Sequence, residues 1–363
     1  MKKEWKKWLK LLIFTPLVLI LIGINVYEDP ANIFHKDSGK ISDALLNGES
    51  VYFESGNCDE RAIKREMIEK MPKNVACLVI GPSLSLGIDS EDVGEESFYN
   101  LSVSGMNYYD YLAILAMLKA NGVHADRIIL CVDSYFFDPA QFADGSRDPS
   151  FMKYAASMAD YLNGAEFKKP SGIDFSKINV GVRESFSIAY FQSAVKYIKN
   201  NKSLLVQTAR WGITDENTEC FAHLMSDGSY VYAENELKKT SEAIKEDAGY
   251  YPIETTFAYG RHMDENSRKM FVKMVDYMMA EGSEVEFILF PLSPALWNRI
   301  ENDEGAAGYF ILDEIETFAN EMAVERGITL YGSFDPNNVG VEDEDFLDVR
   351  HLRNERISEY YDL

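Results

Sequence analysis

Apolar runs of strand length alternate with helical segments along this chain of 363 residues. The apolar runs lie at 74–81, 97–103, 127–133, 284–291 and 328–332, and amphipathic or apolar helical patterns lie at 108–122, 265–282 and 309–327. Nearly continuous apolar strands are typical of a parallel sheet that is covered by helices on both faces. The sequence therefore predicts an α/β protein with a mostly parallel sheet.

The alternation stops between Asp133 and about Glu284. This stretch contains helical segments such as 185–201 and polar loops such as 226–236. We interpret residues from about 134 to 283 as a large, mainly helical insertion between two strands. Such an insertion is able to form a lid or a docking surface.

The amino-terminal residues resemble a membrane anchor. Five lysines in residues 1–10 precede 17 uncharged residues at 11–27, which is near the lower limit for a membrane-spanning helix. The pattern predicts a cytoplasmic tail at 1–10, a transmembrane helix at 11–27 and a membrane-proximal segment at 28–73, followed by an extracytoplasmic α/β domain at 74–363. A cleaved signal peptide is the alternative, but the run ends in "INVYEDP", without a small-residue cleavage pattern.

Charge and cysteine content exclude some classes of function. The chain has 59 acidic and 36 basic residues, a net charge of −23, which disfavours binding to nucleic acid. Its four cysteines have no pair with the spacing of a zinc site, so we expect neither a structural metal nor a cofactor. Cys77 and Cys131 lie in apolar runs and are predicted to be buried thiols.

One serine is placed where a parallel sheet binds its ligands. In "VACLVIGPSLSLGIDS" (75–90), Ser83 follows the end of the first predicted strand. Ligands of such sheets bind outside the carboxyl ends of the strands. The segment is either a simple turn or the site of a nucleophile, with Ser85 as the second candidate.

A nucleophilic serine needs a base, and the chain has only five histidines. His351 follows the last predicted strand, and Asp348 lies three residues before it in "EDFLDVRHLRN" (344–354). In a tight turn, this spacing lets the carboxylate hold the imidazole, as in a Ser–His–Asp triad. Arg350, between them, is expected to face solvent or to meet an anionic group of a substrate.

Other residues are candidates for binding the oxyanion or the substrate. Gly105 ends the second apolar run and is able to offer its backbone N–H, although an ordinary strand-to-helix turn explains it as well. Asn107 and Ser134 occupy similar loops, and Trp297 in "FPLSPALW" (290–297) is able to stack on a sugar or simply to belong to a rigid loop.

Taken together, these motifs resemble those of the SGNH (GDSL-like) hydrolase superfamily. The order is Gly-Pro-Ser after the first strand, "NLSVSG" after the second, and Asp-x-x-His near the carboxyl terminus. The closer likeness is to membrane-anchored members that assist O-acetylation of polysaccharides or D-alanylation of teichoic acid. The resemblance implies a flavodoxin-like sheet, Ser83 as nucleophile, His351 and Asp348 as its partners, and Gly105 as an oxyanion donor.

The sequence departs from the family pattern in two places. Proline stands at position 82, where Asp or Ser is usual, and the Gly-x-Asn-Asp block is absent. "CVDSYFF" with Asp133 and Ser134 occupies the place of that block, and a carboxylate is a poor oxyanion donor.

Three functions remain open at this stage. The first is extracytoplasmic, serine-dependent transfer of an acetyl or similar acyl group to or from a cell-surface polysaccharide or polymer. The resemblance implies a membrane-bound O-acyltransferase as the partner for that reaction. The second is a non-catalytic carbohydrate-binding or assembly subunit, and the third is a carbohydrate esterase or lipase.

Overall fold

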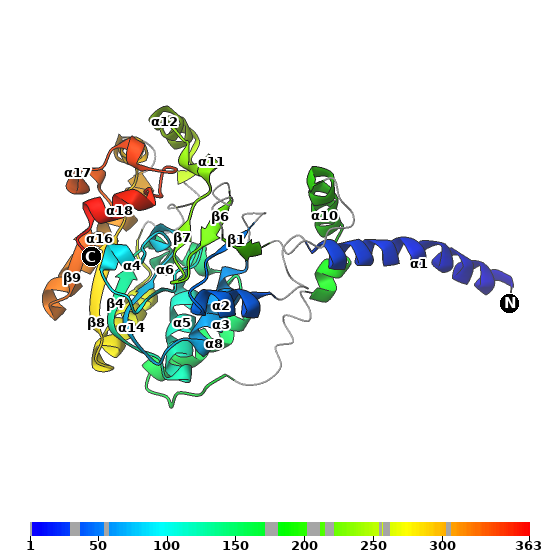
Figure 1. The fold of residues 1–363 in the computed structure, drawn as a ribbon, viewed down its shortest axis with the longest axis horizontal. Helices are drawn as coiled ribbons and strands as arrows, with labels where there is room; N and C mark the ends of the chain where they lie inside the picture. Colours follow the sequence, from blue (N-terminus) through cyan, green and yellow to red (C-terminus); the bar gives the residue numbers. More distant parts are fainter. Residues whose placement is uncertain are drawn as a thin grey trace.

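The computed structural model describes residues 2–29, 37–53, 58–170, 181–201, 211–214, 221–253, 256, 262–302 and 306–363. It is an α/β structure in which two sheets lie among helices (Figure 1). The first has five strands in the order β3 (Phe98–Asn100), β2 (Asn74–Ile80), β4 (His124–Cys131), β8 (Glu284–Leu289) and β9 (Thr329–Gly332). The second has four, in the order β5 (Trp211–Ile213), β1 (Val51–Phe53), β6 (Ala222–Leu224) and β7 (Tyr230–Val231).

The five-stranded sheet is parallel throughout, as the sequence predicts. Numbered by their position along the chain, its strands have the order 2-1-3-4-5 of doubly wound flavodoxin-like sheets. Consecutive residues of β2 and β4 are buried, including Cys77 and Cys131, so both faces of the sheet are covered. The order reverses between β2 and β4, and ligands bind at such a switch point.

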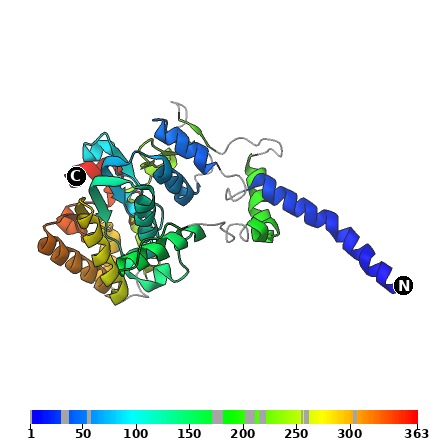
Figure 2. The same cartoon turned by 90° about the horizontal axis from the view of Figure 1, so that it is seen from below.

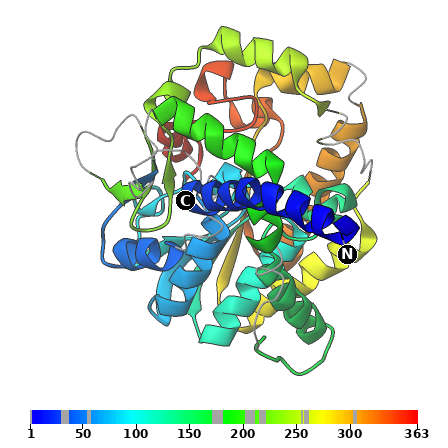
Figure 3. The ribbon, with the colours of Figure 1, turned by 90° about the vertical axis from the view of Figure 1, so that its right-hand side faces the viewer.

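Helices connect and cover these strands (Figure 3). Before β4 lie α1 (Lys2–Glu28), α2 (Ser38–Leu46), α3 (Glu60–Lys70), η1 (Ser83–Ser85), α4 (Ser90–Val93) and α5 (Tyr108–Asn121). Between β4 and β8 lie α6 (Ser134–Phe137), α7 (Pro139–Phe142), α8 (Pro149–Leu162), α10 (Ile188–Asn201), α11 (Glu234–Leu237), α12 (Ser241–Tyr250) and α14 (Glu265–Ala280). After β8 come α15 (Pro294–Asn302), α16 (Ala306–Arg326), α17 (Pro336–Val339), η2 (Asp343–Asp345) and α18 (Asn354–Tyr360).

The residues between β4 and β8 are not only helical. They supply β5, β6 and β7, which pair antiparallel with β1 or with one another. This second sheet corrects the prediction of a single, mostly parallel sheet. Strands of two or three residues give little periodic signal in a sequence, and only their pairing with β1 or with one another makes them strands.

The predicted transmembrane anchor at 11–27 is wrong. Within the described residues, no helix is both long and apolar enough to span a membrane. The uncharged run is shorter than the roughly 20 apolar residues that a span needs, and it is interrupted by polar positions such as Thr15 and Asn25. The predicted cytoplasmic tail at 1–10 and the extracytoplasmic location of the remainder depended on that anchor and are corrected with it.

The end of α1 makes polar contacts instead. The Asn25 side-chain amide donates hydrogen bonds to the carbonyl oxygens of Glu184, Ser185 and Ser187, at 3.0, 3.1 and 2.9 Å. These bonds hold the segment that leads into α10, which packs against α1 away from the two sheets (Figures 1 and 2).

A buried lysine joins the two sheets. Lys64 of α3 is fully buried, and its ammonium donates to the carbonyl oxygen of Asn100 in β3 at 2.6 Å and to that of Gly228 in the β6–β7 turn. Burial lowers the pKa of Lys64 to about 8, while the negative charges of Glu60 and Asp227 partly oppose that shift. A neutral amine still has two N–H groups, enough for both carbonyls.

Lys64 makes stability depend on pH. The unfolded chain keeps this lysine protonated up to a pKa near 10.5, whereas the folded protein releases the proton near pH 8. The unfolded state therefore binds more protons between these values, and the free energy of unfolding is expected to rise across that window by roughly 3 kcal/mol. Urea unfolding at pH 7.5, 9 and 10.5 measures this rise. The Lys64→Met variant should lack this rise. If the free energy of unfolding changed with pH equally in both proteins, the lowered pKa of Lys64 would be contradicted.

Candidate active site

Ser83 opens a tight turn at the carboxyl end of β2. Gly81 and Pro82 lead from the strand into η1, whose first residue is the half-buried Ser83. A Cβ atom on Gly81 would lie 2.3 Å from Ser85 Oγ and 2.4 Å from Cys131 Cβ. Glycine at this position therefore lets the turn pack directly against the end of β4.

The structure brings together the three side chains that the sequence analysis selected. His351 Nε2 lies 2.8 Å from Ser83 Oγ, although the two residues are 268 positions apart. His351 Nδ1 lies 2.9 Å from each carboxylate oxygen of Asp348. The His351 and Asp348 side chains are 23% and 41% exposed, so solvent reaches this site. The contacts are those of a Ser–His–Asp triad.

Backbone bonds fix the loop that carries the aspartate and the histidine. The Leu347 N–H donates to the His351 carbonyl oxygen at 2.7 Å, which closes the loop on itself. The Ser293 N–H, after β8, donates to the Val349 carbonyl oxygen at 3.0 Å. The His351 loop is thus attached to the same sheet edge that presents Ser83.

The surroundings of Asp348 favour its ionised form. Burial by itself would raise the pKa of this carboxyl, but the hydrogen bond and charge of His351, with the backbone N–H groups of Arg350 and His351, hold it well below its usual value. Both N–H groups donate to Asp348 Oδ1, at 2.8 and 2.9 Å. An ionised Asp348 accepts a hydrogen bond from the N–H at Nδ1, which keeps the proton on Nδ1 and leaves the Nε2 lone pair for the Ser83 hydroxyl.

Arg350 does not face solvent, and that expectation is corrected. Its guanidinium is buried and donates to Asp133 Oδ2 at 2.9 Å, across 217 residues. It also lies over the ring of Tyr135, 5.3 Å from the centroid. Asp133 follows β4, so this buried ion pair connects the His351 loop with the central strands.

The loop that contains Gly105 lies beside the nucleophile turn. The Val103 N–H donates to the Gly81 carbonyl oxygen at 3.1 Å. Arg61 of α3 donates to the carbonyl oxygens of Ser104 and Gly105, at 3.1 and 3.2 Å. Gly105 has a φ of +57°, which favours glycine. Arg61 belongs to residues 28–73, which the sequence analysis interpreted as a membrane-proximal segment, so this segment helps to hold the Gly105 loop.

Two backbone amides near this turn are candidates for oxyanion donors. Among the hydrogen bonds of the described residues, the N–H groups of Ser83 and Gly105 have no acceptor. Unpaired donors beside a nucleophile are what a developing oxyanion requires.

The remaining candidates are buried. Asn107 caps α5 through its side-chain oxygen, and its amide donates to the carbonyl oxygens of Gln141 in α7 and Gly145 after that helix. Ser134 is buried with its hydroxyl 3.5 Å from Asp133 Oδ1, and Trp297 is only 5% exposed, so it presents no face to a sugar. Ser85 is fully buried and bonded to the Ser102 hydroxyl at 2.9 Å, which disfavours it as the nucleophile.

Sequence reasoning missed Tyr232. Its ring lies edge-on to the His351 imidazole, with centroids 6.4 Å apart. Two residues earlier, the Tyr230 N–H donates to the Leu86 carbonyl oxygen at 2.8 Å, and the Tyr230 carbonyl oxygen accepts from the Asn354 amide at 2.7 Å. This strand of the insertion therefore connects the turn after Ser83 with the helix after His351. In the sequence, Tyr232 lies in the polar stretch 226–236, which carries no motif that would mark it as a site residue.

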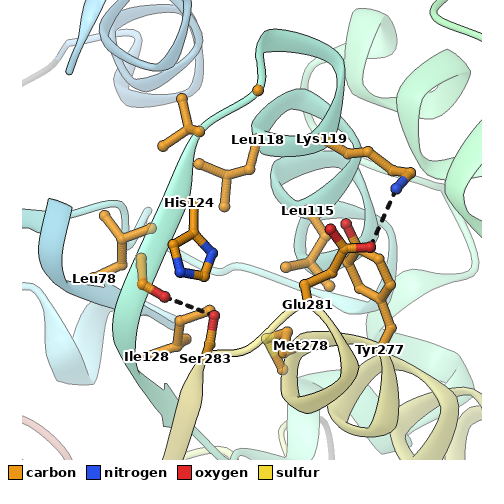
Figure 4. Close-up of a pocket in the computed structure, with 13 residues that line it drawn as sticks. Leu78, Leu115, Leu118, Lys119, His124, Ile128, Tyr277, Met278, Glu281 and Ser283 are labelled. Carbon is orange, nitrogen blue, oxygen red and sulfur yellow. Dashed lines mark hydrogen bonds and ion pairs between the residues drawn. The ribbon is translucent and has the colours of Figure 1, made fainter. Parts of the chain in front are cut away.

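The cavity in Figure 4 is separate from the triad. Its volume is about 230 Å³, and it lies between α5 and α14, where His124 begins β4. Ser83 lies at the opposite, carboxyl edge of the sheet. Within the described residues, no group of three or more His, Cys, Asp or Glu side chains is arranged to hold a metal ion.

Comparisons with known proteins add no assignment. No model of a known protein family matches the sequence, and no curated protein matches it. The resemblance to SGNH hydrolases therefore stays a prediction, carried by the residues described above.

The Asp133–Arg350 pair is expected to control the position of His351. Removing one partner of a buried pair typically costs about 3–5 kcal/mol. In Asp133→Asn, the freed Arg350 should shift the loop, and we expect Ser83 to react with a serine-directed fluorophosphonate at least 10-fold more slowly. Thermal unfolding and the labelling rate are measured together.

The matched control is the Arg127–Glu286 pair, which joins β4 and β8 with N and O atoms 2.7 Å apart. Glu286→Gln should lower the melting temperature and leave the labelling rate within about 2-fold. Equal losses of labelling in both variants would show that the Asp133–Arg350 pair acts only through global stability.

Proposed function

We propose that this protein catalyses acyl transfer from an ester through Ser83, His351 and Asp348. The observation that carries the proposal is the continuous hydrogen-bonded series from Asp348 through both ring nitrogens of His351 to Ser83 Oγ. A half-buried serine with a base at 2.8 Å and a carboxylate behind that base meets the geometric requirements of an activated nucleophile.

The first half of the reaction acylates Ser83. Its Oγ attacks the carbonyl carbon of the ester while His351 Nε2 takes the hydroxyl proton. The N–H groups of Ser83 and Gly105 stabilise the negative oxygen of the tetrahedral intermediate. When the intermediate collapses, the bond to the alcohol breaks, and His351 returns the proton to that alcohol.

The second half releases the acyl group. His351 removes a proton from an incoming hydroxyl, whose oxygen attacks the acyl-serine, and the proton then returns to Ser83. Water as the acceptor gives an esterase, and a polymer hydroxyl gives an O-acyltransferase. Asp348 holds the imidazole in one tautomer and balances its charge during both halves.

The resemblance to SGNH hydrolases supports the same assignment. It selected the residues of the triad from sequence alone, and these are the residues in mutual contact. The missing asparagine reduces the proposed oxyanion site to backbone donors, because Asp133 is engaged with Arg350. Loss of one such donor is worth about 10²–10³ in rate in known enzymes, so we expect slow turnover.

The acceptor and the partner stay predictions of the resemblance. Transfer of an acetyl or similar group to a polysaccharide is compatible with a site that is partly screened by Tyr232. The proposed partnership with a membrane-bound O-acyltransferase no longer has the support of an anchor. An assembled triad favours catalysis over the alternative of a carbohydrate-binding subunit.

Labelling with a fluorophosphonate tests the proposal directly. We expect mass spectrometry of the full chain to find one adduct, on Ser83, and none in Ser83→Ala. His351→Ala should slow labelling by roughly 10²–10⁴, since the base is lost. Ser85→Ala is the matched control and should keep the adduct. A folded wild-type protein that remains unlabelled would favour the binding subunit.

A further inference from the structure

Arg147 lies against the loop that carries the proposed oxyanion donor. A Cβ atom built on Gly105 would lie 2.7 Å from one terminal nitrogen of Arg147 and 2.9 Å from its Cζ. The arginine is exposed, whereas Gly105 is half-buried. The guanidinium therefore covers Gly105 at the carboxyl edge of the sheet, where Ser83 also lies.

The backbone around Arg147 is held in place. The Asn107 amide donates to the Gly145 carbonyl oxygen at 2.9 Å, and the Ser146 hydroxyl donates to the buried carboxylate of Asp110. The Asp148 N–H donates to Ser146 Oγ at 3.2 Å. These bonds attach the loop to the start of α5 and fix where the Arg147 side chain begins.

No described residue neutralises the charge of Arg147. In the part of the chain that the structure describes, its guanidinium has no hydrogen bond, ion pair or ring contact. The other arginines near the site are paired, Arg61 with Asp110 and Arg350 with Asp133. The adjacent Asp148 pairs with Arg65 instead. The protein has a net charge of −23, yet the positive charge of Arg147 lies beside Gly105, the proposed oxyanion donor.

We propose that Arg147 binds an anionic group, a carboxylate or a phosphate, of the ester that Ser83 attacks. The inference rests on the proposed function and adds the substrate class. The overall negative charge of the protein repels anionic esters at a distance, so a local guanidinium is needed to hold one. Its planar fork of donors matches both carboxylate and phosphate oxygens.

The test measures how fast the full-length protein hydrolyses esters that are matched in structure and differ in charge. Methyl 4-acetoxybenzoate is neutral, 4-acetoxybenzoate carries a carboxylate and 4-acetoxyphenyl phosphate carries a phosphate on the alcohol side. Mono-4-nitrophenyl glutarate, compared with 4-nitrophenyl butyrate, places the anion on the acyl side. These arms distinguish the kind of anion and its position.

In Arg147→Gln we expect kcat/KM for at least one anionic ester to fall roughly 10- to 100-fold, the range for a hydrogen bond to a charged group. Values for the neutral esters should change less than about 2-fold, and Arg147→Lys should recover part of the loss. Lys40→Gln, an exposed position on α2, removes the same charge elsewhere and should leave the ratios unchanged.

Two failures are distinguishable. If wild-type Ser83 reacts with the fluorophosphonate and hydrolyses esters, but Arg147→Gln leaves every anionic-to-neutral ratio unchanged, the inference on Arg147 is overturned and the proposed function stands. If Ser83 neither labels nor turns over any ester in the folded protein, the proposed function fails, and the assignment of an anionic ester fails with it.

Discussion

The parallel pairing of β2 with β4 is the constraint on which the candidate site depends. This pairing places Ile80 opposite Leu130, so that β2 and β4 both end at the carboxyl edge of the sheet. Parallel strands require crossovers, and their carboxyl ends therefore collect loops from distant parts of the chain. Ser83 follows one of these strands, and Asp133, the partner of Arg350, follows the other.

Two buried arginine–aspartate pairs position the loops at this edge. Arg350 with Asp133 holds the loop that carries His351, and Arg61 with Asp110 holds the loop that carries Gly105. Both pairs are nearly inaccessible to water, so separating either one would leave an uncompensated buried charge. Exposed charged groups behave differently because solvent screens them, and among the described residues the exposed Arg147 has no ion-pair partner.

Segments outside the parallel sheet complete the site. The amino-terminal part contributes Arg61 and Lys64 through α3, and the insertion contributes Tyr230 and Tyr232. Lys64 reaches both sheets, and Tyr230 contacts both the turn after Ser83 and Asn354. The segment of the insertion at Tyr230 is thus held beside the site by hydrogen bonds of its backbone N–H and carbonyl groups.

The sequence by itself determined the parallel sheet and the three residues of the candidate triad. Continuous apolar runs report burial on both faces, and Asp348 and His351 are close enough along the chain for one tight turn to join them. Only the tertiary structure decided the surroundings: the burial of Arg350, the capping role of Asn107, the second sheet, and the contact of Tyr232 with His351. The amino-terminal pattern also misled, because an uncharged run near the lower length limit does not by itself make a membrane span. Local patterns reveal what a residue's own segment does, whereas contacts across 217 or 268 residues depend on how the loops at one sheet edge pack together.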